Sequence, residues 1–439
     1  MDGMKQVAQI GARVKGRWLK KGFWAVMDQG LFAGSNFILN ILLARWLTPS
    51  EYGAFGMAFA VFLLIGSLHS AMLVEPMLVF GSGRYKERLT EYLGALIYGH
   101  LSFVALGSLA LLLVGLGFAL WGSASLSVSL LALALAGPFI LLLWLMRRAC
   151  YALLEPRLAA VGGAWYMLLM CAGAFVLYWS GWLSTASALG VMGISSLAVS
   201  LWLAVRLRVK SPPLRRDDII GKVFKAHWEY GRWSVASKGL SWVPSNIFYL
   251  LLPIWGGLAA GGSFKAMMNL LMPMLQANAA LTVLLLPILV RARQHSEFRS
   301  HVRLALVLFS VAMLAYWLLL GVFHEPVVDL LYGGRYVEHS DLLWLFGLIP
   351  VAASIKEILS QALRALERPD QLFLAYLFAA LVVGSLGVGC MYVWGIAGAG
   401  TGFLLSQVTV AVTVAVLLKA HYQRSSDELL PTQVGQESR

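Results

Sequence analysis

Charged residues are scarce in this 439-residue chain, where they make up 13% of the total. Soluble globular proteins average about 25% charged residues. Hydrophobic residues account for 59% of the chain. This balance excludes a soluble globular domain and predicts a polytopic membrane protein.

Acidic residues are fewer than basic ones, 21 against 34, which gives a net charge of +13. The basic residues lie in short clusters between apolar segments, as they do in the cytoplasmic loops of membrane proteins. Membrane lipids are therefore the expected partners, and nucleic acid is not.

Cysteine is also rare. The three cysteines, Cys150, Cys171 and Cys390, lie within apolar segments and lack the spacing of metal ligands. Small hydrophobic packing explains them, so the sequence predicts neither a disulfide scaffold nor a metal site, and it implies no cofactor.

A nucleotide-binding motif is missing as well. The glycine-rich stretch at residues 395–402 follows no predicted strand and is not continued by Gly-Lys-Ser/Thr, so we interpret it as a helix-packing turn. The sequence therefore gives no sign that the protein hydrolyses a nucleotide.

Long apolar runs are what the chain does have. A bilayer core needs about 20 mostly apolar residues per helix, and the sequence contains about twelve such segments. Their approximate bounds are 22–46, 53–80, 92–120, 126–149, 158–180, 186–207, 230–255, 264–290, 301–323, 340–363, 370–394 and 397–420. Basic clusters follow every second segment, so the positive-inside rule predicts that both termini are cytoplasmic.

These segments predict an all-α protein in two lobes of six helices. We expect the following order: a basic cytoplasmic leader (1–21), an N-lobe (22–209), a cytoplasmic linker (210–229), a C-lobe (230–420) and a cytoplasmic tail (421–439).

The first span is repeated in the second half of the chain. A constant offset that carries Gly22 onto Gly231 also matches Trp24 with Trp233 and Trp46 with Trp255. Because six spans separate the copies, they have the same orientation. The sequence therefore predicts a parallel pseudo-two-fold repeat.

Polar residues on the first span share one helix face. Gln29, Asn36 and Asn40 are separated by seven and four residues, which places them within about 40° of one another. The offset carries this ridge onto Lys238, Ser245 and Tyr249. We expect the two ridges to line a central cavity, although such side chains also hold helices together.

Lysines and arginines within spans are candidates for binding an anionic substrate. Lys238 lies too deep in its span to snorkel easily, so we expect it to line the cavity. Arg232, Lys265 and Arg45 lie nearer helix ends. Each of these three is a further cavity candidate, and the alternative for Arg232 and Arg45 is an interfacial anchor.

Two intramembrane acids, Asp28 and Glu75, are candidates for proton or sodium coupling, because a dry site brings proton release toward neutral pH. The alternative is structural pairing with Lys238 or a neighbouring basic residue. His69 and His100 also lie within apolar spans, where packing is the simpler explanation.

Residues 29–85 resemble the N-terminal part of the Wzx-type polysaccharide flippases of the multidrug/oligosaccharidyl-lipid/polysaccharide exporter superfamily. In that family an outer turn of the form L-[TS]-P-x-[ED]-[YF]-G joins the first two helices. The matching residues here are Leu47, Thr48, Pro49, Glu51, Tyr52 and Gly53.

The resemblance implies a pair of six-helix lobes that open alternately to the cytoplasm and the periplasm. It implies a flippase of the bacterial inner membrane, and not an enzyme, that moves an undecaprenyl-diphosphate-linked oligosaccharide for exopolysaccharide, capsule or O-antigen export. Glycosyltransferases and a polymerase of the same pathway are the implied partners. A cationic cavity would suit the diphosphate, yet this chain supplies few central cations, chiefly Lys238.

Two alternatives stay open. A multidrug-type proton or sodium antiporter of the same superfamily would bind cations in an acidic cavity, and the ridge with Lys238 argues against that. A membrane glycosyltransferase or polysaccharide polymerase needs catalytic clusters on sizeable outer loops, for which residues 323–340 are the one candidate.

Overall fold

The computed structural model of this chain describes residues 2–210, 219–292 and 297–427. Within these ranges the regular structure is helical and contains no strand, which confirms the expected all-α class. Residues 211–218 of the predicted linker and residues 428–439 of the predicted tail lie outside the described residues.

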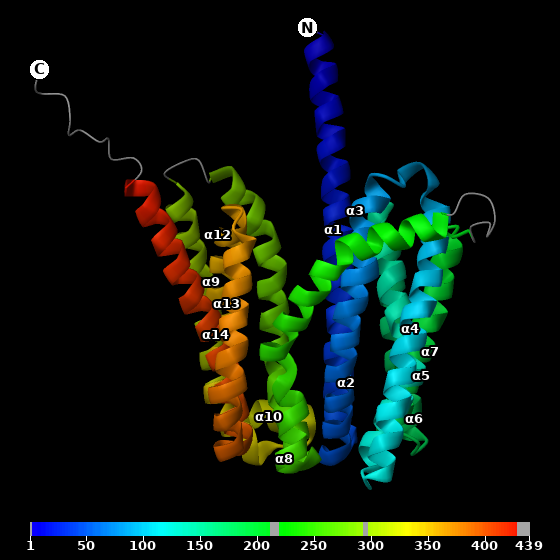
Figure 1. Cartoon of the computed structure of the whole chain (residues 1–439), viewed down its shortest axis with the longest axis vertical. Coiled ribbons are helices and arrows are strands. Elements are labelled where there is room, and N and C mark those ends of the chain that lie inside the picture. Colours follow the sequence, from blue (N-terminus) through cyan, green and yellow to red (C-terminus); the bar gives the residue numbers. More distant parts are fainter. Residues whose placement is uncertain (1, 211–218, 293–296, 428–439) are drawn as a thin grey trace, which may run out of the picture. The chain divides into compact units, whose positions relative to one another are not determined.

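Figure 1 shows the helices coloured in chain order. The first seven are α1 (Asp2–Trp46), α2 (Pro49–His69), α3 (Glu75–Ser82), α4 (Leu89–Leu120), α5 (Ala124–Ala152), α6 (Pro156–Trp179) and α7 (Thr185–Arg206). They are followed by α8 (Ile219–Ala292), α9 (Phe298–Val322), α10 (His324–Tyr332), α11 (Leu343–Phe346), α12 (Leu348–Ala365), α13 (Pro369–Val382) and α14 (Val388–Asp427). Two π-helical turns, Ser70–Val74 and Val383–Gly387, connect α2 to α3 and α13 to α14.

Ten helical stretches of the described chain are long and apolar enough to cross a membrane. Two of them, Ile220–Ala279 and Asp370–Ala420, are 60 and 51 residues long, whereas one crossing needs about 20 residues. Each bends at a glycine with non-helical backbone angles, Gly257 (φ 83°, ψ 162°) or Gly395 (φ 55°, ψ −124°). Divided at these bends, the ten stretches become twelve, in the order predicted. The chain is a multi-pass membrane protein.

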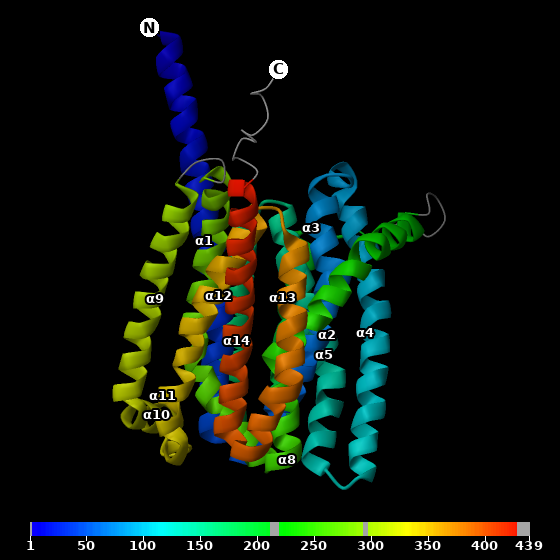
Figure 2. The same ribbon diagram turned by 60° about the vertical axis from the view of Figure 1, so that its left-hand side comes forward.

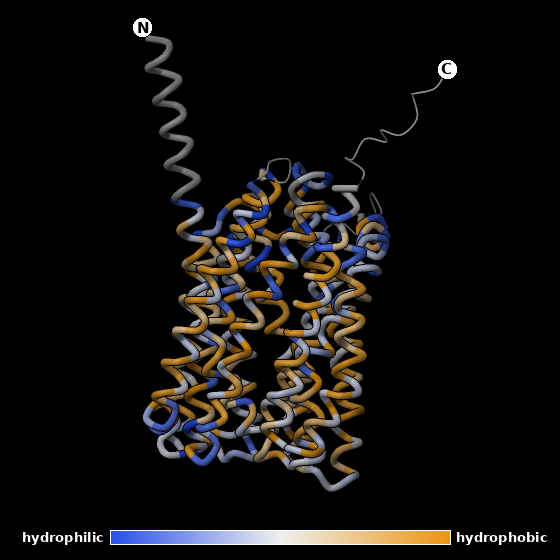
Figure 3. Tube along the Cα trace, turned by 90° about the vertical axis from the view of Figure 1, so that its left-hand side faces the viewer, coloured by the Kyte–Doolittle hydropathy of each residue, from blue (hydrophilic) through white to orange (hydrophobic). Residues whose placement is uncertain are grey.

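Hydropathy and capping explain where the helices begin and end. Hydrophobic residues fill the middle of the helices, and hydrophilic residues gather toward their ends (Figure 3). At the start of α2, Thr48 and Glu51 form a reciprocal capping box, and Pro49 occupies the first helical turn, where its missing N–H costs nothing. The predicted outer turn is therefore a helix start specified by its own residues.

The helices form two compact units. The first contains Met1–Trp242, Tyr249–Asn269 and Leu331–Gly333, and the second contains Val243–Phe248, Leu270–Leu330 and Gly334–Arg439. Long α8 therefore contributes residues to both units.

The first unit is a bundle of the N-terminal helices with parts of α8. Helix α5 packs against α4 and α7, and α1 packs against α6. Near the end of α1, Trp46 stacks on Tyr178 of α6 with ring centroids 4.3 Å apart. This bundle holds most of the predicted polar residues.

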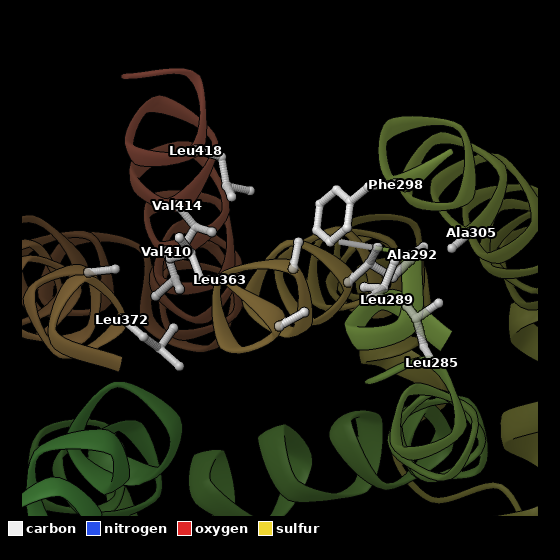
Figure 4. Close-up of a cluster of buried hydrophobic side chains, with 14 of the residues drawn as sticks. Leu285, Leu289, Ala292, Phe298, Ala305, Leu363, Leu372, Val410, Val414 and Leu418 are labelled. Atoms are coloured by element: carbon white, nitrogen blue, oxygen red, sulfur yellow. The ribbon is translucent and has the colours of Figure 1, made fainter. Parts of the chain in front are cut away.

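The second unit has its own apolar core. Helix α12 packs against α9 and α14, and α13 packs against α14 (Figure 2). Figure 4 shows the buried side chains that fill the space between these helices and the end of α8. The labelled ones are Leu285, Leu289, Ala292, Phe298, Ala305, Leu363, Leu372, Val410, Val414 and Leu418.

The bend in α8 repeats the turn between α1 and α2. The offset that carries Gly22 onto Gly231 also carries Thr48 onto Gly257. Thr48 begins α2, and Gly257 is the bend after which α8 continues. The two copies are thus both helical hairpins, one closed by a capped turn and the other by a glycine bend.

Within the first unit the two hairpins cross at glycines. A Cβ added to Gly53 would lie 1.8 Å from the carbonyl oxygen of Leu258, and one added to Gly262 would lie 2.1 Å from that of Pro49. The repeat offset carries Pro49 onto Leu258 and Gly53 onto Gly262. The two contacts are therefore equivalent to each other, as a two-fold relation requires, and they support the predicted repeat.

Candidate substrate site

Asp28 lies on α1 and is completely buried in a bidentate ion pair. Its Oδ1 accepts from Nε of Arg147 on α5 at 3.1 Å, and its Oδ2 accepts from Nη2 of Arg147 at 2.9 Å. The Tyr151 hydroxyl also donates to Oδ2 at 2.7 Å. The guanidinium of Arg147 lies 3.8 Å from the centroid of the Phe32 ring. The structural alternative predicted for Asp28 is thus present, with Arg147 as the partner.

A short segment between α2 and α3 leaves two backbone carbonyls without helical donors. Pro76 has no N–H to donate to the carbonyl of Met72. In the π-helical turn, the N–H of Glu75 bonds to Ser70 instead of to Ala71. The carbonyls of Ala71 and Met72 are therefore available to a neighbouring helix.

The first part of α8 packs on these two carbonyls. Nδ1 of His227 donates to the carbonyl oxygen of Met72 at 2.8 Å, so its Nε2 accepts from the Tyr92 hydroxyl at 2.7 Å. One turn later, a Cβ on Gly231 would lie 3.0 Å from the carbonyl oxygen of Ala71. Glycine at position 231 permits this close approach.

Lys238 continues the same face of α8 and pairs with Glu75. Nζ of Lys238 lies 3.0 Å from Oε1 of Glu75, and the Ser234 hydroxyl donates to Oε2 at 2.6 Å. The spacing of His227, Gly231, Ser234 and Lys238 places all four on one side of the helix. The structure therefore brings a predicted substrate residue and a predicted coupling residue together.

The two ion pairs differ in their exposure. The Lys238 and Glu75 side chains are 42% and 32% exposed, whereas Arg147 and Asp28 are 8% and 0% exposed. Partly exposed pairs contribute about 0–1 kcal/mol to stability, whereas removing one partner of a buried pair costs about 3–5 kcal/mol. The Lys238–Glu75 pair is thus the more accessible of the two, and the Asp28–Arg147 pair is the one whose disruption would be costly.

The amide ridge of α1 is partly satisfied within its own helix. The amide nitrogen of Asn36 donates to the carbonyl of Phe32 at 2.9 Å, and that of Asn40 donates to the carbonyl of Asn36 at 2.8 Å. The Tyr52 hydroxyl of α2 donates to Oδ1 of Asn40 at 3.2 Å. Gln29 is exposed. Asn40 thus joins two helices, while Gln29 is accessible at the ridge's start.

Lys265 is buried among aromatic rings in the second part of α8. Nζ lies 5.8 Å from the ring centroid of Tyr52, 5.2 Å from Phe55, 5.0 Å from Phe59 and 5.8 Å from Tyr249. Each separation is within the range of a cation–π contact, which contributes from about 0.5 kcal/mol at exposed sites to about 2 kcal/mol when desolvated.

The remaining predicted residues are dispersed. Arg232 is exposed, with its guanidinium 5.6 Å from the Trp233 ring centroid, and Arg45 is exposed beside Gly333. Ser245 is half-buried in the part of α8 that belongs to the second unit. That the ridges on α1 and α8 line a common cavity remains a prediction.

A pair of buried histidines joins α2 to α4. Nε2 of His69 and Nδ1 of His100 are 3.0 Å apart and share one hydrogen bond. Packing is the expected role of both, but no sequence pattern indicates that they contact each other. Within the described ranges, no group of three histidines, cysteines or acids is placed to hold a metal ion.

The sequence did not indicate three further polar residues. Tyr151 donates to Asp28, Ser234 donates to Glu75, and His227 contacts the carbonyl of Met72. Arg147 stands out only as a basic residue at the end of a span. Pro76 was the one available signal for the docking of α8, because a proline within a helix leaves a carbonyl that needs a donor from elsewhere.

No protein-family profile matches this chain, and no curated protein matches it. Solved structures match in fold. An inward-facing multidrug resistance MATE family transporter of the MOP superfamily has a TM-score of 0.74 at 15% identity, covering 93% of this chain and all of that one. The MATE multidrug transporter DinF-BH, solved in a complex, gives 0.66 at 16% identity, covering 92% of this chain and 95% of that one.

A third structure is a MOP superfamily transporter from Pyrococcus furiosus Vc1, described as having a binding pocket of reversed polarity. It has a TM-score of 0.63 at 14% identity, covering 93% of this chain and 96% of that one. This chain therefore has the two-lobed fold of the MATE transporters of the MOP superfamily. The superfamily-level fold that the resemblance implied is confirmed.

Proposed function

We propose that this chain is a flippase of the bacterial inner membrane. It moves an undecaprenyl-diphosphate-linked oligosaccharide from the cytoplasmic to the periplasmic leaflet by alternating access, with both termini in the cytoplasm. The fold of the MATE transporters supports alternating access. Glycosyltransferases and a polymerase that make and consume the lipid-linked saccharide are the proposed pathway partners.

The observation that carries this proposal is the sign of the membrane-embedded charge. In the first unit, Arg147 neutralises Asp28, and Lys238 neutralises Glu75. Lys265 has no carboxylate within ion-pair distance in the described part of the chain. Among these five residues the basic ones outnumber the acidic ones, and we take this as favouring a substrate with a diphosphate over a cationic drug.

Lys238 is the proposed diphosphate contact. Its pairing with Glu75 is partly exposed and weak, so a doubly charged phosphate group can displace the carboxylate. Ser234 lies beside Glu75 and offers a hydroxyl donor to the same group. Binding would thus exchange an internal partner for the substrate.

The displacement of Glu75 from Lys238 also distinguishes the two candidates for ion coupling, Glu75 and Asp28. Glu75 would be released when the diphosphate binds Lys238, which leaves its carboxylate without its basic partner and available to a coupling ion. Asp28 is held by Arg147 and Tyr151. We therefore propose Glu75 as the site of proton or sodium coupling ahead of Asp28.

The other predicted cavity residues have lesser roles. Gln29, Asn36 and Ser245 would contact sugar hydroxyls, which amide and hydroxyl groups bind well. Arg45, in the last turn of α1, and Arg232, more than three turns into α8, are both exposed, and we propose that they meet the substrate as it enters or leaves.

The test is reconstitution in vesicles with a fluorescently labelled lipid-diphosphate oligosaccharide, with and without proton and sodium gradients. Outward movement of the label is expected in the native protein. Lys238→Ala should lower the initial rate at least tenfold, while Lys419→Ala, an exposed lysine on α14, should leave it unchanged.

Glu75→Gln separates the proposed roles within the pair. Removing the competing carboxylate should lower KM for the labelled lipid and abolish any dependence on the proton gradient. If Lys238→Ala and Glu75→Gln lower the initial rate of lipid movement equally and leave KM unchanged, the pair serves only to hold α8 in place.

The second candidate is a multidrug-type proton or sodium antiporter, favoured by the multidrug transporters with this fold. Efflux of a fluorescent cationic dye from the same vesicles distinguishes the two. Efflux of the dye with no movement of the lipid would replace the flippase proposal. The fold matches are transporters, so they lend no support to a glycosyltransferase or polymerase.

A further inference from the structure

Nζ of Lys265 lies within cation–π distance of four aromatic rings, which we call the aromatic box. Three of the rings, Tyr52, Phe55 and Phe59, come from α2, and the fourth, Tyr249, comes from α8 itself. Nζ lies between 5.0 and 5.8 Å from all four ring centroids. Rings around a cation at these distances are the arrangement by which proteins bind alkylammonium ligands.

The box supplies no opposite charge. Lys265 is 8% exposed, and in the described ranges neither an ion pair nor a hydrogen bond is made by its amino group. The ring faces are thus the groups that solvate it. A lysine placed for structural pairing would instead have a carboxylate or carbonyl within reach.

The repeat explains how the lysine fits. The offset carries Gly56 of α2 onto Lys265 of α8, so the two are equivalent positions. A Cβ on Gly56 would lie 2.7 Å from Cδ of Lys265, which means that the stem of the lysine fills the space of the missing side chain. The second copy of the repeat carries the lysine, and the glycine at the equivalent position of the first copy leaves space for its side chain.

We propose that Tyr52, Phe55, Phe59 and Tyr249 form a binding site for an alkylammonium group, and that Lys265 occupies this site itself. Removing the lysine side chain beyond Cβ then opens the site to small primary alkylammonium ions. In the native protein, the internal cation keeps positively charged solutes out of the box. This inference concerns binding and holds whichever substrate is transported.

The test uses a probe that matches the atoms removed. Lys265→Ala deletes Cγ, Cδ, Cε and Nζ, which correspond to n-propylammonium. Purified native protein, Lys265→Ala and Lys265→Met are unfolded thermally in detergent with n-propylammonium chloride, sodium chloride or 1-propanol. The alcohol has nearly the same shape without the charge.

In Lys265→Ala, n-propylammonium chloride should raise Tm by about 2–4 °C more than sodium chloride or 1-propanol does, at a probe concentration well above Kd. The native protein and Lys265→Met should respond equally to all three additives, because a side chain already fills the box. An equal response of Lys265→Ala to n-propylammonium and 1-propanol would overturn the proposal.

A second measurement decides the matter if Lys265→Ala does not fold. Phe59→Leu removes the nearest ring and is made in the native protein and in Lys265→Met. The loss of Tm should be larger in the native background, where the ring faces a cation. Equal losses in both backgrounds would mean that the rings only pack, and the proposal would fail.

Discussion

Asp28 shows that the role of a single residue depends on groups far away in the chain. Its own position indicates only an acid within an apolar span. Arg147 and Tyr151, more than a hundred residues later, are the partners that hold the carboxylate in place. Desolvating a charge is expensive, so the partner is what allows the acid to be there.

The first residue-scale prediction follows from this pairing. Asp28→Asn leaves Arg147 buried without a counter-charge and should destabilise the fold by about 3–5 kcal/mol. The double variant Asp28→Leu/Arg147→Met should recover most of the loss, because no charge remains to be desolvated. Thermal unfolding of the purified proteins measures both, and an unaltered Tm in Asp28→Asn would contradict the pairing.

The identity of Lys238 as a deep cation was predictable from its place in the span. Its pairing was not, because Glu75 lies in another helix and is brought close by the docking of α8. The same limit applies to Lys265. The sequence places it near a helix end as a candidate for meeting an anionic substrate, whereas its burial and the four rings near it, which come from two helices, are seen only in the structure.

At the scale of elements, proline and glycine determine how α8 lies against its neighbours. Pro76 and the π-helical turn free two carbonyls; His227 of α8 donates to that of Met72, and Gly231 lies close to that of Ala71. The sequence alone contained each of these residues. It did not reveal that they meet, since a free carbonyl is satisfied by any donor that the fold brings near.

The prediction at this scale concerns the glycine crossing of α2 and α8. Gly53→Ala and Gly262→Ala should each lower stability by about 1–3 kcal/mol or more, because the added Cβ meets a backbone oxygen that a rotamer change cannot move. The two losses should be similar, since the positions are equivalent under the repeat.

Gly117→Ala in α4 is the matched control. Nothing lies within 4 Å of its added Cβ, so the helix-favouring alanine should leave Tm unchanged or raise it slightly. Thermal unfolding of all three variants provides the comparison. If Gly117→Ala lowered Tm while Gly53→Ala and Gly262→Ala did not, the close approach of these two glycines to the opposing carbonyl oxygens would be refuted.

At the scale of the whole molecule, topology depends on the two glycine bends. If α8 and α14 each cross the membrane twice, the number of crossings is even, and both termini lie on one side. The positive-inside rule, applied to the basic loops, predicts that this side is the cytoplasm. If either long helix crossed only once, the termini would lie on opposite sides.

Reporter fusions test this directly. A fluorescent protein that folds only in the cytoplasm should be bright at both termini, and a phosphatase active only outside should work at Gly122, in the turn between α4 and α5. A phosphatase at Gly257 should also be active. Phosphatase activity at only one terminus would contradict an even number of crossings, and activity at both termini would contradict the predicted orientation.

The sequence by itself determined the membrane class, the positions of the spans and the offset of the repeat. Those features are local or periodic, because a lipid core sets the length and polarity of each helix independently of the others. Only the tertiary structure decided that Asp28 is paired with Arg147, that Lys238 is paired with Glu75, and that rings surround Lys265. Burial and ion pairing depend on which helices meet, and long-range packing rather than local pattern controls that choice.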